Sequence, residues 1–295
     1  MSPSLPSGVV LDSGRGGLAR LAIDTDTCAA ELYLHGAHLC RWQPRNEPHP
    51  VLWMSEKSRF EAGAPIRGGV PICFPWFGPR AGDASAPVHG VARISAWNLD
   101  GVILGADGSV NVRVNLDCGT LASPHVPLDL VLAYELRLGR GLSMALTVTN
   151  PGDAPITFEE ALHTYLAVSD VRQVSVAGLE GATYVDKVDG ARRKTQADPA
   201  ITIGGETDRL YLDTEAAITL RDPGLGRRVR LEKTGSRSSV VWNPWVAKSR
   251  AMPDFGDDEW PRMICIETAN AADNAVTVPP HGEHSMTATI DVAAG

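Results

Sequence analysis

The sequence has no hydrophobic run that approaches the roughly 20 apolar residues of a membrane-spanning helix, so we expect no membrane partner. Its start also lacks a basic stretch followed by an apolar one, and we therefore expect no secretory signal. The five cysteines form no C-x-x-C pair, and no N-x-S/T glycosylation site is present. These features together predict free thiols in a reducing cytoplasm.

Positive charge is scarce, because 27 lysines and arginines face 35 acidic residues, which gives a net charge of −8. A nucleic-acid-binding protein presents a basic face to the phosphates, so we expect no nucleic-acid partner. An anionic small molecule would need a local group of cations to hold it against this overall negative field.

Helical periodicity is nearly absent, and only residues near 53–60 have the pattern of a short helix. Glycine (29) and proline (21) are plentiful along the whole chain, as in proteins built from short strands and turns. Strands are predicted at 8–12, 18–24, 30–42, 111–117, 129–138, 142–149, 156–168, 173–177, 216–220, 227–233, 238–242, 262–267 and 285–292. The sequence 139–141, Gly-Arg-Gly, predicts a hairpin turn. Since no linker or repeat is visible, we predict an all-β protein, a large antiparallel β sandwich with one domain over residues 1–295.

Three short motifs have ordinary structural explanations. Residues 14–19 fit a loose dinucleotide-binding fingerprint, but the strand that follows them makes a hairpin turn the better interpretation. The pair Glu160 and His163 resembles half of a di-iron motif, and a second copy on helices is missing. His35 and His38 have no evident third ligand. We therefore expect neither a nucleotide cofactor nor a metal.

Three charged runs are typical of solvated surface. Two are basic, at 192–194 and 227–230, and each lies beside a predicted turn. The third is the acidic run 254–259. Because it directly precedes Trp260 in the sequence, a role at the rim of a binding site stays open for it.

The stretch 240–270 carries the strongest functional signal. Glu267 ends the apolar run 263–266, which predicts a buried strand. Burial raises the pKa of a carboxyl group toward neutrality, as a general base requires. Trp242, Trp245 and Trp260 lie in the same stretch and offer flat faces for sugar rings.

Three further segments contain charged or polar residues that a purely structural role does not explain. Arg67 begins an apolar, turn-rich loop that extends to residue 79. His89 and Arg93 are four residues apart, and Gly90 permits close approach of the backbone. His163 is embedded in an apolar strand, where a satisfied core histidine is the more common finding. In combination with Glu267, however, these residues provide an acid, a base and two cations for an anion.

The chain also resembles a known family. The segments that carry the resemblance are RGGVPICFPWFGP (67–79), HGVARISAWNL (89–99), EEALHTYLAVSDV (159–171), GGETDRLY (204–211) and VVWNPWVAKSRAMPDFGDDEWPRMICIETAN (240–270). They occur in the order found in the hexose-phosphate mutarotases, a branch of the aldose 1-epimerase superfamily. This resemblance covers nearly the whole chain. It implies a galactose mutarotase-like β supersandwich and an isomerase with glucose-6-phosphate 1-epimerase activity that needs no metal or cofactor.

The resemblance also implies roles for particular residues. His163 matches the general acid and Glu267 the general base. Arg67 and Arg93 match arginines that grip the substrate and its phosphate. Two further substrate-binding residues are implied, His89 at the sugar and Asp208 at its hydroxyls. One position departs from the pattern, because Val88 stands where many relatives carry a polar residue.

The implied reaction interconverts the α and β anomers of a hexose 6-phosphate by opening and reclosing the ring. We expect Glu267 to take the C1 hydroxyl proton while His163, as an imidazolium, protonates the ring oxygen. Three alternatives stay open: an aldose 1-epimerase of free sugars, an enzyme of another phosphosugar, and a non-catalytic carbohydrate-binding β sandwich with Trp76, Trp242 or Trp245 as platforms. The expected partner is a small phosphosugar, and we expect the protein to be a monomer.

Overall fold

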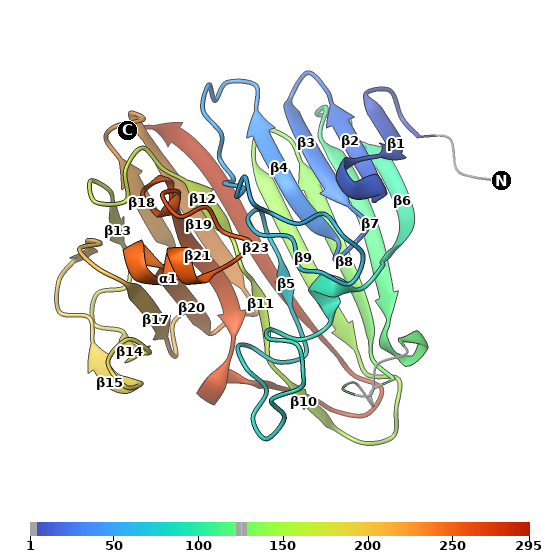
Figure 1. Cartoon of the computed structure of the whole chain (residues 1–295). Coiled ribbons are helices and arrows are strands. Elements are labelled where there is room, and N and C mark those ends of the chain that lie inside the picture. The colour runs from blue at the N-terminus through green and yellow to red at the C-terminus, as the bar shows by residue number, and fades with distance from the viewer. Residues whose placement is uncertain (1–4, 122–124, 126–128) are drawn as a thin grey trace.

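The computed structural model describes residues 5–121, 125 and 129–295, and it consists mainly of β-sheets (Figure 1). All pairings between its named strands are antiparallel, in one nine-stranded, one eight-stranded, one four-stranded and one two-stranded sheet. The predicted all-β, antiparallel fold class is therefore confirmed. Among the described residues, no helix has both the length and the apolar character needed to cross a bilayer.

The nine-stranded sheet is the largest, with the order β16-β13-β18-β19-β23-β9-β8-β7-β6. In chain order its strands are β6 (Asn98–Leu104), β7 (Val110–Asp117), β8 (Val131–Leu138), β9 (Leu142–Thr149), β13 (Ser175–Ala177), β16 (Ala200–Ile201), β18 (Ile218–Asp222), β19 (Arg227–Thr234) and β23 (Glu283–Ala294). The predicted turn at residues 139–141 joins β8 to β9.

The eight-stranded sheet has the order β15-β14-β17-β20-β21-β11-β5, and β12 also pairs with β21. Its strands are β5 (Ile72–Cys73), β11 (Glu160–Leu162), β12 (Tyr165–Ala167), β14 (Thr183–Asp186), β15 (Arg192–Thr195), β17 (Thr207–Tyr211), β20 (Ser238–Asn243) and β21 (Met263–Asn270). All eight residues of β21 are buried, which identifies it as the central strand of this sheet.

The remaining elements are short. The four-stranded sheet contains β1 (Val9–Ser13), β2 (Ala19–Asp24), β3 (Cys28–Tyr33) and β4 (His38–Pro44), and β10 (Ile156–Phe158) pairs with β22 (Val276–Val278). The only α-helix of the described residues is α1 (Trp245–Ala251). Five 3₁₀ turns complete the elements: η1 (Arg15–Gly17), η2 (Ala92–Ile94), η3 (Cys118–Thr120), η4 (Trp260–Arg262) and η5 (Ala272–Asn274).

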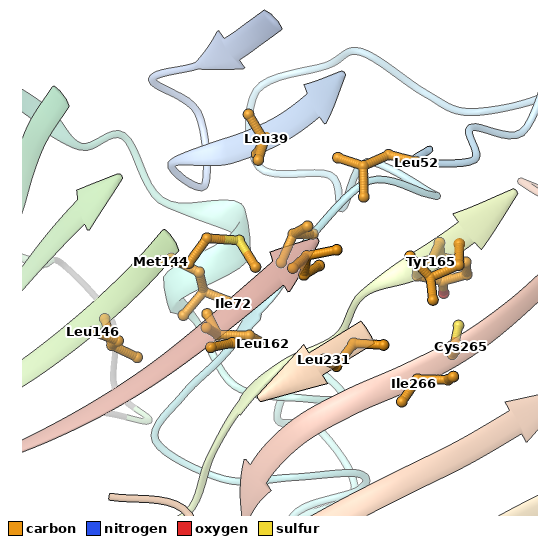
Figure 2. Close-up of a cluster of buried hydrophobic side chains, with 14 of the residues drawn as sticks. Leu39, Leu52, Ile72, Met144, Leu146, Leu162, Tyr165, Leu231, Cys265 and Ile266 are labelled. Carbon is orange, nitrogen blue, oxygen red and sulfur yellow. The ribbon is translucent and has the colours of Figure 1, made fainter. Parts of the chain in front are cut away.

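Alternating side chains fill the space between the sheets. In β9 every second residue is buried, as expected for a strand with one face on a core. Figure 2 shows this core, where Met144 of the nine-stranded sheet lies near Ile72 and Leu162 of the eight-stranded sheet, and Leu231 of the former lies beside Ile266 of the latter. The core holds the eight-stranded sheet, and with it the residues described below, in a fixed position.

Some local predictions were wrong. The segment 156–168 is divided into β10, β11 and β12 instead of forming one strand, and residues 53–60 form no helix. Helix α1 was missed, because its seven residues are too few to establish a helical period. The turn predicted at residues 14–19 is confirmed, since the 3₁₀ turn η1 leads into β2.

Two charged runs are not simply solvated. Arg227 is only 3% exposed and pairs with Glu47 at 3.2 Å while donating to the carbonyl of Pro50. In the acidic run, Glu259 accepts hydrogen bonds from Ser55 and from the backbone of Gly256, so it holds the loop together. Arg227 is therefore buried and Glu259 half-buried, each with hydrogen-bond partners that composition alone does not reveal.

Candidate active site

One cavity of about 440 Å³ is lined by all six residues that the sequence predicts for the site. They are Arg67, His89, Arg93, His163, Asp208 and Glu267. They come from β17, β21, η2 and three loops, so only the folded chain brings them together. A second cavity of about 700 Å³ lies beside β4, shares no lining residue with the first and contains none of these six side chains.

His163 lies in the break between β11 and β12. Its backbone N–H donates to the carbonyl of Pro71 at 3.0 Å, which extends the antiparallel pairing of β11 with β5 by one residue. The imidazole stacks on the ring of Tyr165, with centroids 4.8 Å apart and an interplanar angle of 12°. These contacts fix the ring at the cavity wall, where it is 6% exposed.

Glu267 projects from the central strand β21 toward that imidazole. The Oε1 atom of Glu267 lies 3.4 Å from Nε2 of His163, and Glu267 is 2% exposed. Its Oε2 atom and Nδ1 of His163 are buried without a hydrogen-bond partner among the described residues. Buried polar groups are normally satisfied, so these two unpaired atoms distinguish the pair from ordinary core residues.

The environment shifts both groups toward their neutral forms. Burial raises the pKa of Glu267 well above its ordinary value, and this confirms the expected direction; Lys187 acts in the opposite sense. Burial, and then the charges of Arg93 and Arg67, hold the pKa of His163 well below 6.5. In the free protein, desolvation and two arginines therefore act against the imidazolium form that we expect of His163 during ring opening.

His89 presents a defined tautomer to the cavity. The backbone N–H of Gly78 donates to Nδ1 of His89 at 3.1 Å, so the proton of the neutral ring resides on Nε2. Burial holds the pKa of His89 well below 6.5, with Arg93 acting in the same direction. The next residue must be glycine, because a Cβ at Gly90 would lie 1.9 Å from the carbonyl oxygen of Phe74. His89 can therefore act as a fixed hydrogen-bond donor.

Arg93 is a buried cation without a matching anion. It is 8% exposed, and one guanidinium nitrogen donates to the carbonyl of Val88 at 2.6 Å. Its Nε has no hydrogen-bond partner, and within the described part of the chain no carboxylate oxygen lies within 4.0 Å of its guanidinium. Burial lowers the pKa of Arg93 from its ordinary value. An uncompensated buried cation is costly unless an anion binds beside it.

Arg67, in contrast, is already paired. Two of its guanidinium nitrogens bond the carboxylate of Asp254 at 3.1–3.2 Å, and a third donates to the hydroxyl of Tyr165 at 2.9 Å. Asp254 is itself buried and does not line the cavity, so it contacts the site only through Arg67. Because Tyr165 also stacks on His163, Arg67 helps to hold the imidazole in place.

Two lysines of the cavity were missed by the sequence analysis. Lys187 lies 3.9 Å from Asp208 and 4.6 Å from the centre of the Phe77 ring. Lys248, on α1, lies 3.8 Å from Asp208 and 3.0 Å from Glu206. Lys187 lies outside the quoted motifs, and Lys248 lies within the motif at 240–270 without an assigned role, because each becomes relevant only through the fold around Asp208.

Comparison with known proteins places the chain in a family. Residues 20–291 match the family model described as aldose 1-epimerase. The chain belongs to the aldose 1-epimerase family. The family match confirms the resemblance and the isomerase class that the motifs predicted.

Two relatives of this aldose 1-epimerase family member have provisional names. An Escherichia coli protein provisionally named glucose-6-phosphate 1-epimerase is 36% identical over 253 residues, which cover 86% of this chain and 83% of the relative. A Cenchrus ciliaris protein with the same provisional name is 33% identical, with coverage of 87% and 79%.

Solved structures agree with the fold of this family member. A crystal structure from Salmonella typhimurium, provisionally described as a mutarotase, is 30% identical, has a TM-score of 0.86 and covers 97% of each chain. A galactose mutarotase-like protein from Clostridium acetobutylicum matches with a TM-score of 0.76 at 14% identity, which supports the fold alone. The expected galactose mutarotase-like sandwich is thus confirmed.

Most of the remaining candidates of the sequence analysis lie outside the cavity of this family member. His35 and His38 each bond a backbone carbonyl, of Ala64 and Gly68 respectively. Of the three tryptophans proposed as platforms, only Trp242 lines the cavity, and it is 7% exposed. Val88 is 47% exposed at the cavity lip, so no polar side chain is supplied there.

Proposed function

We propose that this chain is a glucose-6-phosphate 1-epimerase that interconverts the α and β anomers of hexose 6-phosphates. One observation carries this proposal: the His163–Glu267 pair opens into the same cavity as Arg93, a buried cation with no carboxylate partner among the residues that the structure describes. The pair supplies proton transfer, and the unpaired cation supplies a reason for a phosphate on the substrate.

The proposed reaction needs one proton acceptor and one proton donor at C1. One member of the pair removes the proton of the C1 hydroxyl while the other protonates the ring oxygen, and the C1–O5 bond breaks. Rotation about C1–C2 then presents the other face of the aldehyde, and ring closure reverses both proton transfers. No nucleophile or redox group takes part, so two groups that exchange one proton are sufficient.

The shifted pKa values suit this exchange. In the free protein the directions of both shifts favour a neutral imidazole beside a protonated Glu267, so the pair holds one proton in total. A bound phosphate would oppose the charges of Arg93 and Arg67, which hold the pKa of His163 down. Substrate binding would thereby bring the imidazole closer to the protonated form that we assign to it during ring opening.

Arg93 and Lys187 are the groups we assign to the phosphate. Arg93 has free N–H donors for charge-assisted bonds, and Lys187 is held 3.9 Å from Asp208 in the same cavity. This local pair of cations attracts the phosphate dianion although the chain as a whole has a net charge of −8. We assign His89 and Asp208 to the sugar hydroxyls.

The experiment is NMR exchange between the α and β C1 protons of glucose 6-phosphate, with free glucose and mannose 6-phosphate measured alongside. We expect enzyme-dependent exchange for glucose 6-phosphate and little acceleration for glucose. Equal acceleration of free glucose would favour an aldose 1-epimerase, and exchange restricted to mannose 6-phosphate would favour another phosphosugar. Sugar binding without any exchange would leave the carbohydrate-binding alternative.

The phosphate assignment is tested with Arg93→Gln. We expect the KM for glucose 6-phosphate to rise by at least tenfold, because a charge-assisted bond contributes roughly 1.5–3 kcal/mol. Arg250→Gln is the matched control, since Arg250 lies on α1 with a side chain 60% exposed and outside the cavity. An unchanged KM in a folded Arg93→Gln protein would reject the role of Arg93 at the phosphate.

We also propose that the protein acts as a monomer, with residues 1–295 as one domain, in the cytoplasm. The five cysteines are all free and buried, as a reducing compartment permits. Light scattering after size-exclusion chromatography measures the mass directly, and the monomer of 31.4 kDa is the expected result. A mass near twice that value would reject the monomer.

A further inference from the structure

Cys265 lies behind the acid–base pair and takes no part in the proposed reaction. It precedes Glu267 by two residues on β21, so both side chains project from the same face of the sheet. Its backbone pairs with Tyr165 on one side and Trp242 on the other, and Figure 2 shows its sulfur beside Tyr165. The thiol therefore lies close behind His163 and Glu267, although Cys265 itself does not line the cavity.

These three side chains form a compact donor group. One atom each of His163, Cys265 and Glu267, namely an imidazole nitrogen, Sγ and a carboxylate oxygen, all lie within 4.8 Å of one another. All three residues are buried, and no other such group of three occurs among the described residues. Two of them also carry the orphaned Nδ1 and Oε2 atoms, so the group is incompletely satisfied.

The spacing approaches that of a metal site. Zinc binds nitrogen and oxygen at about 2.0–2.2 Å, so two such ligands at a tetrahedral angle are about 3.4 Å apart. Nε2 of His163 and Oε1 of Glu267 are 3.4 Å apart. A thiolate belongs about 3.6 Å from each of them by the same geometry, so a shift of Sγ by roughly 1 Å completes the three-ligand set.

We propose that His163, Cys265 and Glu267 form a binding site for a thiophilic divalent cation such as Zn²⁺, and that the bound cation excludes substrate from the cavity. The fourth position opens into the cavity lined by His163 and Glu267, through which the ion enters. Binding forms a metal–sulfur bond and releases the thiol proton to solvent. The cation is an inhibitor of this site and not a cofactor of the reaction.

The donor set selects the class of metal. Sulfur and imidazole favour Zn²⁺ and Co²⁺, whereas Mg²⁺ and Ca²⁺ require oxygen ligands. The negative charges of the thiolate and the carboxylate together neutralise the dication. This neutralisation is needed because Arg67, Arg93 and Lys187 line the same cavity and would repel a cation. Nδ1 of His163 has no acceptor to orient the ring, so we expect reversible binding that a chelator removes.

The first experiment titrates the native, reduced protein with Co²⁺ and records its absorption spectrum. We expect a thiolate-to-cobalt charge-transfer band in the near ultraviolet that saturates at one equivalent, and Zn²⁺ should abolish it by displacement. Absence of this band in the native protein would overturn the site, whatever the behaviour of any variant.

The second experiment repeats the titration with Cys265→Ser, which keeps the size of the side chain. We expect the charge-transfer band to disappear and the affinity for Co²⁺ to fall at least tenfold, since even loss of an outer contact costs about 10–100-fold. Cys118→Ser is the matched control, because Cys118 is equally buried in η3 and lies outside the group. A band of equal strength in folded Cys265→Ser protein would overturn the assignment.

The third experiment measures Co²⁺ binding in the presence of glucose 6-phosphate. The exclusion of substrate by the metal rests on the proposed function. If the two ligands exclude each other, the apparent affinity for Co²⁺ falls as the concentration of glucose 6-phosphate rises. Unchanged Co²⁺ affinity at saturating sugar phosphate would overturn the exclusion. A protein that binds Co²⁺ but never accelerates anomer exchange would instead refute the proposed function and leave the metal site standing.

Discussion

His163 and Glu267 acquire their properties from their surroundings and not from their residue types. A buried histidine is usually a satisfied core residue, but here Nδ1 has no partner among the described residues and the ring is held by Tyr165. Glu267 is buried on a central strand, and its pKa rises because water is excluded from it. At this scale, burial without full satisfaction distinguishes the candidate catalytic residues from ordinary core groups.

Glu267→Gln and His163→Gln should each slow anomer exchange of glucose 6-phosphate. Because a positioned proton-transfer group contributes about 10²–10⁴-fold, we expect rate losses of that size with little change in thermal stability. The measurement is the NMR exchange rate beside a thermal melt. A folded variant that retains the native rate would remove its residue from the mechanism.

The imidazole of His163 should be neutral at pH 6.5 in the free, chelator-treated protein. The first cause is burial, and Arg93 and then Arg67 add to it. ¹⁵N NMR measures the protonation state, with His163→Gln used to assign the signal. In Arg93→Gln the pKa of His163 should rise, because one of the charges that lower it is gone. Protonation of native His163 at pH 6.5 would contradict this account.

Short breaks in the strands, more than the strands themselves, position the site. His163 lies where β11 ends and β12 begins, and His89 adopts a left-handed backbone conformation with φ of 64°. Behind this break, the fully buried Glu160 accepts hydrogen bonds from Asn270 at 2.9 Å and from His284 at 3.0 Å. The bonds connect β11, β21 and β23, and so tie both large sheets together beneath His163.

This connection should make stability depend on pH through His284. Its hydrogen bond to Glu160 raises the pKa of His284 above 6.5 in the folded state. The added stability is therefore fully present below pH 6.5 and lost as pH rises through the raised pKa, by on the order of 1 kcal/mol. Urea unfolding at several pH values measures the slope.

His284→Gln should remove this part of the pH dependence. His281→Gln is the matched control, because His281 has a side chain 66% exposed and pairs only with the exposed Asp153. If His284→Gln and native protein lose stability equally across this pH range, the connection through His284 does not contribute.

At the scale of the whole molecule, the two large sheets share one core, and the cavity opens on the face of the eight-stranded sheet. Its wall combines β17, β20 and β21 with α1 and the loops that carry Arg67, His89 and Lys187. This assembly concentrates cations in a molecule of net charge −8. Local cations in a partly desolvated cavity outweigh distant charges that water and salt screen.

Inorganic phosphate should therefore stabilise the whole fold. A ligand that binds only the native state adds about 2.7 kcal/mol at a hundredfold excess over its Kd. A thermal melt with and without phosphate measures this as a rise in Tm, whereas an equal ionic strength of sodium chloride serves as the control. Arg93→Gln should lose most of the rise. An equal rise in that variant would show that phosphate acts elsewhere.

The amino-acid sequence alone established the fold class and the six candidate residues, because strand alternation and the ordered motifs are local features. The tertiary structure decided how they meet: His163 and Glu267 are 104 positions apart in the chain, yet 3.4 Å apart in space. It also decided which arginine is unpaired, since Arg67 pairs with Asp254 and Arg93 has no carboxylate partner in the described part of the chain. Pairing, burial and protonation depend on neighbours from distant segments, and those neighbours are set only when the sheets pack.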